Sequence, residues 1–386
     1  MAEKKNKLGL YVHIPFCVKK CAYCDFLSMP ATLATQKAYV DALINEIESY
    51  EELAEEYNVE TIYFGGGTPS VLEPFYVDKI LASIKKVFRC DMCNIKEVTI
   101  EVNPGTIGRE KWQAYKLMGI NRISIGLQSV HNQELKLLGR IHTYEQFLEN
   151  FTAAREAGFE NISVDLMSAL PGQTSEQYRK SLETVAGLSP EHISSYSLIV
   201  EEGTPFWKLY GEDGPKREAL PSEEEDRDMY HSTRKILEAH GYRRYEISNY
   251  AKEGYEAVHN SSYWTGTSYI GFGLGASSYV KDRRFSNTRD MQKYLKCSHI
   301  PSERVMDVEQ LQVEDKMSEF MFLGLRRMCG ISKKEFERRF QKDIQEVYGE
   351  NIERLTKQNL LQAEGDRIYL TEYGIDVSNY VFSEFV

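Results

Sequence analysis

The sequence lacks three features that would place the protein in a membrane, outside the cell or on nucleic acid. No apolar stretch approaches the length that a helix needs to cross a bilayer. The first residues, MAEKKNKLGLYVHIPFC, carry lysines but only a short apolar run that includes a proline, unlike a signal peptide. No basic stripe is visible, because lysines and arginines are interspersed with acids and the net charge is −11. We therefore expect a cytoplasmic protein that binds no nucleic acid, although a local patch can still allow peripheral membrane contact.

The chain also lacks internal repeats of a fixed period and low-complexity segments. Instead, its first half alternates short β-rich runs with amphipathic helical stretches. The β-rich runs are residues 9–14, 60–67, 97–104, 122–129, 161–167 and 192–199. Strand–helix units in series predict parallel strands joined by right-handed crossovers. The expected fold class is α/β, a partial (β/α)6 barrel with functional residues where strands end and loops begin.

Beyond about residue 200 the alternation fades, and we expect three domains. Residues 1–220 form the barrel, and residues 221–305 form an α+β connecting region. In that region the acidic run EEEDRD (223–228) is interpreted as the solvated start of a helix. Residues 306–386 read as helices that end in a small β-hairpin, which suggests a winged-helix-like module. Its acids and the missing basic stripe favour a packing or lid role over DNA binding.

Three cysteines, Cys17, Cys21 and Cys24, stand close together with no fourth cysteine nearby. Three thiols cannot pair off into disulfides, and a closed structural zinc site needs four protein ligands. A cubane [4Fe–4S] cluster instead takes one ligand per iron, so three cysteines leave the fourth iron open. The spacing therefore allows a cluster with a missing ligand as well as an incomplete zinc site.

The zinc alternative requires a fourth ligand, which one of the other cysteines would have to supply. Cys90 and Cys93 form a CxxC pair that can in principle complete such a site. They follow a helical stretch and precede a β-rich run, so we favour a surface turn. Cys297 and Cys329 are isolated, and we expect them to be small buried hydrophobes.

The triad resembles a known family. CxxxCxxC with an aromatic residue, Tyr23, just before its last cysteine is similar to the signature of radical SAM proteins. The flanks YVHIPFC and YCDF resemble the branch that contains HemN, the oxygen-independent coproporphyrinogen III oxidase, and HemW, a haem chaperone. The resemblance covers nearly the whole chain. It implies that Cys17, Cys21 and Cys24 hold a [4Fe–4S] cluster and that S-adenosylmethionine (SAM) occupies the open iron.

The same resemblance implies a SAM pocket at the strand ends. The motif GGGTPS (65–70) follows the second β-rich run, and glycines let backbone N–H groups approach a ligand closely. In the family this motif meets the methionyl end of SAM. The positions of this sequence that match SAM-contacting family positions are Tyr11, Tyr23, Gly66, Gly67, Thr68, Glu101, Gln128, Arg140 and Asp165. Carboxylates there can accept hydrogen bonds from the ribose and the ammonium group, and Arg140 can form paired bonds to a carboxylate.

Two departures from HemN favour the HemW side of the branch. HemN has a fourth cysteine two residues after the triad, where this sequence has Phe26, and HemN has a longer segment ahead of the cluster, whereas only sixteen residues precede Cys17 here. HNSSYW (259–264) also matches the HNxxYW motif that is associated with haem in the HemW branch. We expect His259 to offer an axial iron ligand, and Tyr263 and Trp264 to offer flat faces to the porphyrin. Asn260 belongs to the same motif.

The resemblance thus implies a haem chaperone that passes haem to haem-requiring membrane or respiratory enzymes. Two alternatives remain: a porphyrinogen oxidative decarboxylase that uses a 5′-deoxyadenosyl radical, and a radical SAM enzyme that modifies haem. Phe26 and HNSSYW favour the chaperone, and coproporphyrinogen III oxidase activity is not expected. If His259 does not hold iron, the next candidates are His13, His131 and His142. Productive SAM cleavage and a homodimer are left open.

Overall fold

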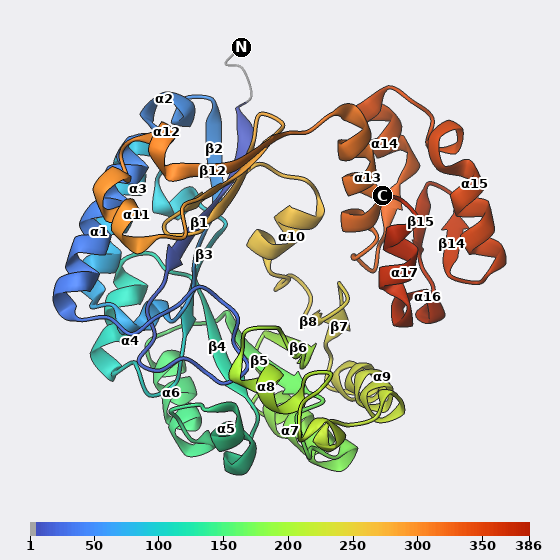
Figure 1. The fold of residues 1–386 in the computed structure, drawn as a ribbon, viewed down its shortest axis with the longest axis horizontal. Coiled ribbons are helices and arrows are strands. Elements are labelled where there is room, and N and C mark those ends of the chain that lie inside the picture. Colours follow the sequence, from blue (N-terminus) through green and yellow to red (C-terminus); the bar gives the residue numbers. More distant parts are fainter. Residues whose placement is uncertain (1–4) are drawn as a thin grey trace.

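Six parallel strands, each followed by a helix, form the largest α/β unit of the protein (Figure 1). The structure, a computed structural model, describes residues 5–386. The six strands are β1 (Asn6–Ile14), β2 (Tyr57–Gly66), β3 (Glu97–Val102), β4 (Arg122–Gln128), β5 (Ile162–Ser168) and β6 (His192–Ser197). The helices after them are α1 (Leu33–Glu48), α2 (Glu51–Ala54), α3 (Pro74–Phe88), α4 (Arg109–Leu117), α5 (Asn132–Leu138), α6 (Tyr144–Glu156), α7 (Ser175–Gly187) and α8 (Pro205–Tyr210). All six predicted strands are confirmed, and they lie next to one another in chain order.

Helices cover the parallel strands, so the strand residues that face these helices are apolar and buried. In β1, Leu8, Leu10, Val12 and Ile14 are fully buried. Ala38 in α1 lies on the exposed side of the helix. The buried positions of α1 instead follow the spacing Gln36, Tyr39, Val40, Ala42, Leu43, Glu46 and Ile47, one face of a 3.6-residue helix.

Four later strands extend the sheet beyond β1. They are β9 (Tyr269–Phe272), β10 (Ser277–Val280), β11 (Arg283–Asn287) and β12 (Val305–Gln310), with α11 (Met291–Cys297) and α12 (Pro301–Arg304) between the last two. Strand β9 pairs with β1 in parallel, and β10, β11 and β12 continue antiparallel. The sheet therefore runs five residues past the expected boundary at residue 305, into a stretch that sequence reasoning assigned to the last domain.

A buried ion pair fastens this extension to α1. Glu46 and Arg304 are both buried, with 3.4 Å between a carboxylate oxygen of Glu46 and Nε of Arg304. Glu46 also accepts hydrogen bonds from the Gly273 N–H at 2.8 Å and from Asn287 Nδ2 at 2.7 Å. Because a buried charge is costly without partners, this cluster ties residues far apart in the chain into one unit.

The opposite edge of the sheet carries β8 (Asn249–Ala251) against β6 and β7 (Arg243–Arg244) against β8. Helix α9 (Glu223–Ala239) precedes them and opens with the exposed acidic run, as predicted, behind a capping box formed by Ser222 and Glu225. Helix α10 (Val258–Trp264) follows and lies at the centre of the molecule in Figure 1, between the sheet and the C-terminal module.

The C-terminal module has its own core and a separate three-stranded sheet. Its elements are α13 (Val313–Gly324), β13 (Ile331–Ser332), α14 (Lys333–Phe340), α15 (Ile344–Lys357), β14 (Leu361–Glu364), β15 (Arg367–Leu370), α16 (Glu372–Asp376) and α17 (Ser378–Ser383). Helices followed by a β14–β15 hairpin match the sequence reading of this segment. Within residues 5–386, no helix is both long enough and apolar enough to span a membrane.

Candidate metal and cofactor site

The loop that carries the cysteine triad follows β1 and is held at both ends. Its ends are joined by the Cys17 N–H, which donates to the Met29 carbonyl at 3.1 Å, and by the Met29 N–H, which donates to Pro15 at 2.9 Å. In its middle, the Ala22 N–H donates to the carbonyl of Leu138 at 3.0 Å. The loop therefore lies over the carboxyl ends of the strands, where α/β proteins place their ligands.

The three thiols face one cavity. Cys17, Cys21 and Cys24 all line a cavity of about 160 Å³, and none of them is in a disulfide. Cys17 Sγ lies 3.5 Å from Thr68 Oγ1, and Arg140 Nη1 lies 3.7 Å from Cys21 Sγ. Burial raises the pKa of the Cys24 thiol to about 11. A bound metal reverses that shift, because a coordinating thiol is deprotonated outright.

The spacing of the three thiols bears on whether they hold a single metal ion or an iron–sulfur cluster. In the part of the chain that the structure describes, no three His, Cys, Asp or Glu side chains converge closely enough to hold a single metal ion. In a cubane each cysteine binds its own iron, so the thiols need not meet at one point. Cys90 and Cys93 precede β3 and so lie at the amino ends of the strands, whereas the cysteine loop lies at their carboxyl ends. Cys93 is exposed in a short 3-10 helix. They are not placed to complete a site with the triad.

The remaining cysteines differ from expectation. Cys297 is only partly buried, and its thiol lies 2.8 Å from Glu303 Oε2. Cys329 was predicted to be a buried hydrophobe and is exposed. The turn Met328–Gly330 between α13 and β13 explains this, because connecting segments run over the surface.

The glycine turn after β2 supports the cysteine loop with its backbone. The Gly67 N–H donates to the Ile14 carbonyl at 2.9 Å, and the Thr68 N–H donates to Phe16 at 2.8 Å. A Cβ atom on Gly67 would lie 2.7 Å from the carbonyl oxygen of Phe16, so only glycine allows this approach. These two N–H groups, which sequence reasoning assigned to a ligand, are taken up by the fold, although both residues still line the cavity.

Two carboxylates face the same cavity. Glu101 on β3 accepts a hydrogen bond from the Tyr63 hydroxyl at 2.7 Å and from the Gly66 N–H at 3.2 Å. Both carboxylate oxygens of Asp165 on β5 lie 3.5 Å from Oγ of Ser124. Burial raises the pKa of Glu101 to about 7, with the Asp165 carboxylate acting in the same direction, and burial also raises the pKa of Asp165. A cationic ligand would relieve both desolvated carboxylates, and SAM carries an ammonium and a sulfonium.

Arg140 and Gln128 line the same cavity at β4, the strand between those that carry the two carboxylates. Arg140 Nη2 donates to Asn103 Oδ1 at 3.0 Å and also to the Gly126 carbonyl, while its buried Nε has no partner among the described residues. Gln128 has a φ of +74° beside a register shift between β4 and β5. A bulge of this kind re-aims a side chain, and Gln128 lines the cavity.

The two tyrosines predicted to contact SAM lie in different places. Tyr23 lines the thiol cavity and packs edge-on against Phe206, with ring centres 6.3 Å apart. Tyr11 instead lines a neighbouring cavity of about 410 Å³, with its hydroxyl 3.1 Å from Nδ1 of His13. The two cavities share Phe26, Gly66 and Glu101, so one opens beside the other.

The predicted haem histidine is bonded inside the fold. His259 is buried, with Nδ1 2.8 Å from Thr61 Oγ1 and Nε2 2.8 Å from the Tyr263 hydroxyl. Its ring stacks on Tyr63, and burial lowers its pKa to about 3. Both nitrogens are therefore engaged, and an iron bond would require one of these contacts to break.

The rest of HNSSYW points in two directions from α10. Tyr263 lines the cavity beside the cysteine loop, and Trp264 lines a separate cavity next to the C-terminal module. Asn260 is partly buried. The N-terminal end of α10 is held by Glu97 of β3, which accepts the N–H groups of Val258 and His259 at 2.7 and 3.2 Å. The motif therefore separates the cavity that Tyr263 lines from the cavity that Trp264 lines, and we call it the partition between these two cavities.

Sequence reasoning missed several cavity residues. Asn103 and Ser124 bond directly to predicted site residues, and Tyr63 supports Glu101. The signal was available, since Asn103 stands two positions after Glu101 and Ser124 stands four positions before Gln128. A period of two places alternate strand residues on the same face.

Comparison with known proteins identifies the class of protein to which the chain belongs. Residues 11–185 match the family model of the radical SAM superfamily, and residues 311–377 match the HemN C-terminal domain. A solved structure of the coproporphyrinogen III oxidase HemN from Escherichia coli has the same fold, with a TM-score of 0.85, 24% identity, and coverage of 99% of this chain and 90% of that one. These matches define the chain as a radical SAM protein, a class that implies a [4Fe–4S] cluster and SAM.

Two relatives are similar over their whole length. The chain is 38% identical to a protein named Heme chaperone HemW of Lactococcus lactis, covering 100% of this chain and 98% of the relative. It is 35% identical to the Bacillus subtilis protein of the same name, covering 97% and 98%. The chain therefore belongs to the HemW family.

Proposed function

We propose that the protein is a haem chaperone that binds haem and delivers it to haem-requiring respiratory proteins. The observation that carries this proposal is the similarity, along the entire chain, to relatives named Heme chaperone HemW. The proposal includes the finer fold, a partial (β/α)6 barrel, an α+β connection and a winged-helix-like C-terminal module. It also places the protein in the cytoplasm, with peripheral contact to membranes that hold its acceptors.

In this proposal Cys17, Cys21 and Cys24 hold the [4Fe–4S] cluster. When bound, the cluster supplies redox-active iron with one position that no cysteine takes. Burial of the thiols keeps water away from the cluster. The donor set fits, because three free thiols face one cavity and both cavity carboxylates are desolvated.

The chain's own residues would then bind SAM. Asp165 and Glu101 accept from the cationic end of SAM, and their charges favour it over neutral analogues. Arg140 and Gln128 would contact its polar groups beside these carboxylates, and Thr68 and Tyr23 shape the cavity. Phe26, which is 63% exposed, lies at the rim that the thiol cavity shares with its neighbour.

The segment HNSSYW would belong to the haem site. Trp264 is the member placed to contact haem directly, since it lines a cavity without taking part in the barrel packing. His259 would hold α10 and Tyr263 in place through its two hydrogen bonds. Asn260 lies on the same helix.

A second candidate function is a radical SAM reaction on a tetrapyrrole. The cavity of about 410 Å³ beside the thiols favours it, because it shares Gly66 and Glu101 with the SAM cavity and is lined by aromatic rings. A reacting substrate would have to lie this close to SAM.

One experiment separates the two candidates. Anaerobically reconstituted protein is titrated with haem and, in parallel, incubated with SAM, dithionite and either haem or coproporphyrinogen III. The chaperone proposal predicts a saturable Soret change and tetrapyrroles of unaltered mass. A failure to bind haem, together with decarboxylated coproporphyrinogen, would replace it with the enzymatic candidate.

A further inference from the structure

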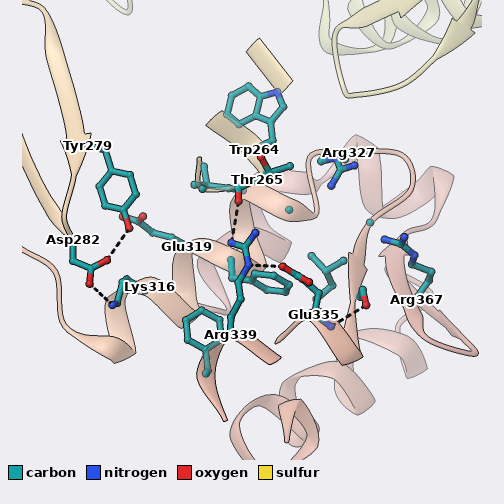
Figure 2. Close-up of a pocket in the computed structure, with 18 residues that line it drawn as sticks. Trp264, Thr265, Tyr279, Asp282, Lys316, Glu319, Arg327, Glu335, Arg339 and Arg367 are labelled. Carbon is teal, nitrogen blue, oxygen red and sulfur yellow. Dashed lines mark hydrogen bonds and ion pairs between the residues drawn. The ribbon is translucent and has the colours of Figure 1, made fainter. Parts of the chain in front are cut away.

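A further cavity, of about 530 Å³, lies between the C-terminal module and the rest of the chain (Figure 2). It is the cavity that Trp264 lines. Three separate segments line it: Trp264–Gly266 after α10, the β10–β11 turn with Tyr279 and Asp282, and the module from α13 to β15. Its volume is within the range of cavities that hold drug-sized ligands. A site formed by distant segments closes only in the complete fold.

Part of the lining of this cavity is apolar and aromatic, whereas the rest carries charged side chains. Phe320, Leu323, Ile331 and Phe340 come from the module, and Trp264 comes from α10. The Trp264 ring is covered by the guanidinium of Arg326, 4.4 Å from the ring centre. Flat apolar walls of this kind suit a planar ligand, because aromatic side chains bury large flat areas.

The acids of the cavity are all paired. Asp282 lies 2.8 Å from Lys316 Nζ, and Glu335 lies 2.7 Å from Nε of Arg339. Glu319 lies 2.7 Å from a guanidinium nitrogen of Arg284, outside the cavity. These acids therefore leave no negative charge unmatched.

Two arginines of the cavity have no such partner. Among residues 5–386, neither the Arg327 nor the Arg367 guanidinium has a hydrogen-bond or ion-pair acceptor. In Figure 2 both lie on the side of the cavity opposite Asp282 and Lys316. Arg327 is partly buried where the chain leaves α13, and Arg367 begins β15. Guanidinium groups form paired hydrogen bonds with carboxylates, so this side fits a ligand with carboxylate groups.

The cavity offers no residue suited to hold iron by itself. Its lining contains no histidine, cysteine or methionine, and its one phenol, Tyr279, lies 3.4 Å from Asp282 Oδ1. A tetrapyrrole here would be held through its carboxylates and its ring faces. Binding would then not depend on the metal.

We propose that this cavity binds the dicarboxylate edge and the apolar ring of a tetrapyrrole, with Arg327 and Arg367 as the carboxylate-binding residues. The proposal rests on the proposed haem-carrying function and adds the place and the mode of binding. It separates the tetrapyrrole from the cluster, with α10 between them.

The test uses metal-free protoporphyrin IX and full-length protein. Fluorescence titrations compare the wild type with Arg327→Gln, Arg367→Gln and the double variant, and Arg227→Gln on exposed α9 serves as a matched loss of charge. The wild type should bind protoporphyrin IX, and the double variant should bind it roughly tenfold to hundredfold more weakly. Protoporphyrin IX dimethyl ester, presented in the same detergent, should lose affinity for the wild type to a similar extent. Arg227→Gln should have no effect, and thermal melting checks that all variants fold.

The outcomes separate the site from the function. Haem binding with no protoporphyrin binding, or equal affinity of the acid and its ester, would overturn the site and leave the chaperone proposal standing. Unchanged affinity in a folded double variant would do the same. If the wild type binds neither haem nor protoporphyrin, the chaperone proposal itself fails.

Discussion

The thiol cavity and the cavity next to the C-terminal module differ in charge and in construction. The thiol cavity lies at the strand ends, where Glu101 and Asp165 are desolvated and shift toward the protonated form. The cavity next to the C-terminal module has its acids paired and leaves Arg327 and Arg367 without acceptors. The first therefore offers desolvated carboxylates to a cationic group, although Lys19, Lys20 and Arg140 also line it, and the second offers free guanidinium groups to an anionic group. One chain can hold two ligands of opposite charge with little competition between them.

The largest expected effect is loss of the cluster. Replacing Cys17, Cys21 and Cys24 by alanine should remove all cluster iron and sulfide after anaerobic reconstitution, because no other thiol faces that cavity. Iron and sulfide analysis with visible absorption measures this. The double variant Cys90→Ala/Cys93→Ala should keep a full cluster. A full complement in the triple variant would contradict the assignment.

A smaller effect should distinguish the two cavities by charge. Asp165→Asn should weaken SAM binding by about 1 to 3 kcal/mol, because a donor of the cofactor loses its charged acceptor. Calorimetry on the reconstituted protein gives the affinity. Protoporphyrin affinity should not change in this variant, and SAM affinity should not change in Arg327→Gln/Arg367→Gln. If either variant weakens both ligands, the cavities are not independent.

His259→Ala tests the partition itself. The variant removes both hydrogen bonds of the ring, so Tyr263 and α10 lose a support, and haem affinity should fall by roughly threefold to tenfold. The position of the Soret band should not change, since the ring nitrogens face Thr61 and Tyr263. A shifted Soret band in the variant would instead identify His259 as an iron ligand. Tyr263→Phe is the matched control, because it removes one of the two bonds.

The smallest effect is a pH dependence confined to the thiol cavity. The pKa of Glu101 is raised to about 7 in the SAM-free protein, so the group gains its negative charge only as pH rises through 7. SAM affinity should therefore increase by a few-fold between pH 6 and 8, and Glu101→Gln should flatten the profile. The same raised pKa stabilises the SAM-free fold at low pH, and that contribution is lost as pH rises toward 7. Haem affinity should show no matching step.

Local patterns predicted the strand–helix units, and the resemblance to radical SAM proteins supplied the expected residues of the thiol cavity. Glu101 and Gln128 stand at the ends of β3 and β4, and Asp165 stands in the middle of the neighbouring β5. Parallel strands bring such positions together whatever lies between them. The same logic could not place β9 beside β1, because no short-range pattern records which distant strand completes an edge. Nor could it place Arg327 and Arg367, which are ordinary charged residues until the module packs near Trp264.

The sequence also could not predict the direction in which a side chain points. HNSSYW reads as one ligand-binding unit, yet one turn of helix sends Tyr263 and Trp264 into different cavities. The glycine turn shows the same limit, since its N–H groups could serve either a ligand or the Ile14 and Phe16 carbonyls. Which partner is used depends on how closely the cysteine loop approaches.

The pairing of β1 with β9 also sets an order of events during synthesis. Chains fold from the N-terminus as they are made. The cysteine loop and its carboxylates are complete once residue 165 has emerged, while β1 keeps an open edge until Tyr269–Phe272 arrives. The extension is then locked by Glu46 and Arg304, and the arginine-bearing cavity forms only after residue 367. A nascent chain would therefore present the three cysteines proposed to hold the cluster before the cavity proposed for a tetrapyrrole can form.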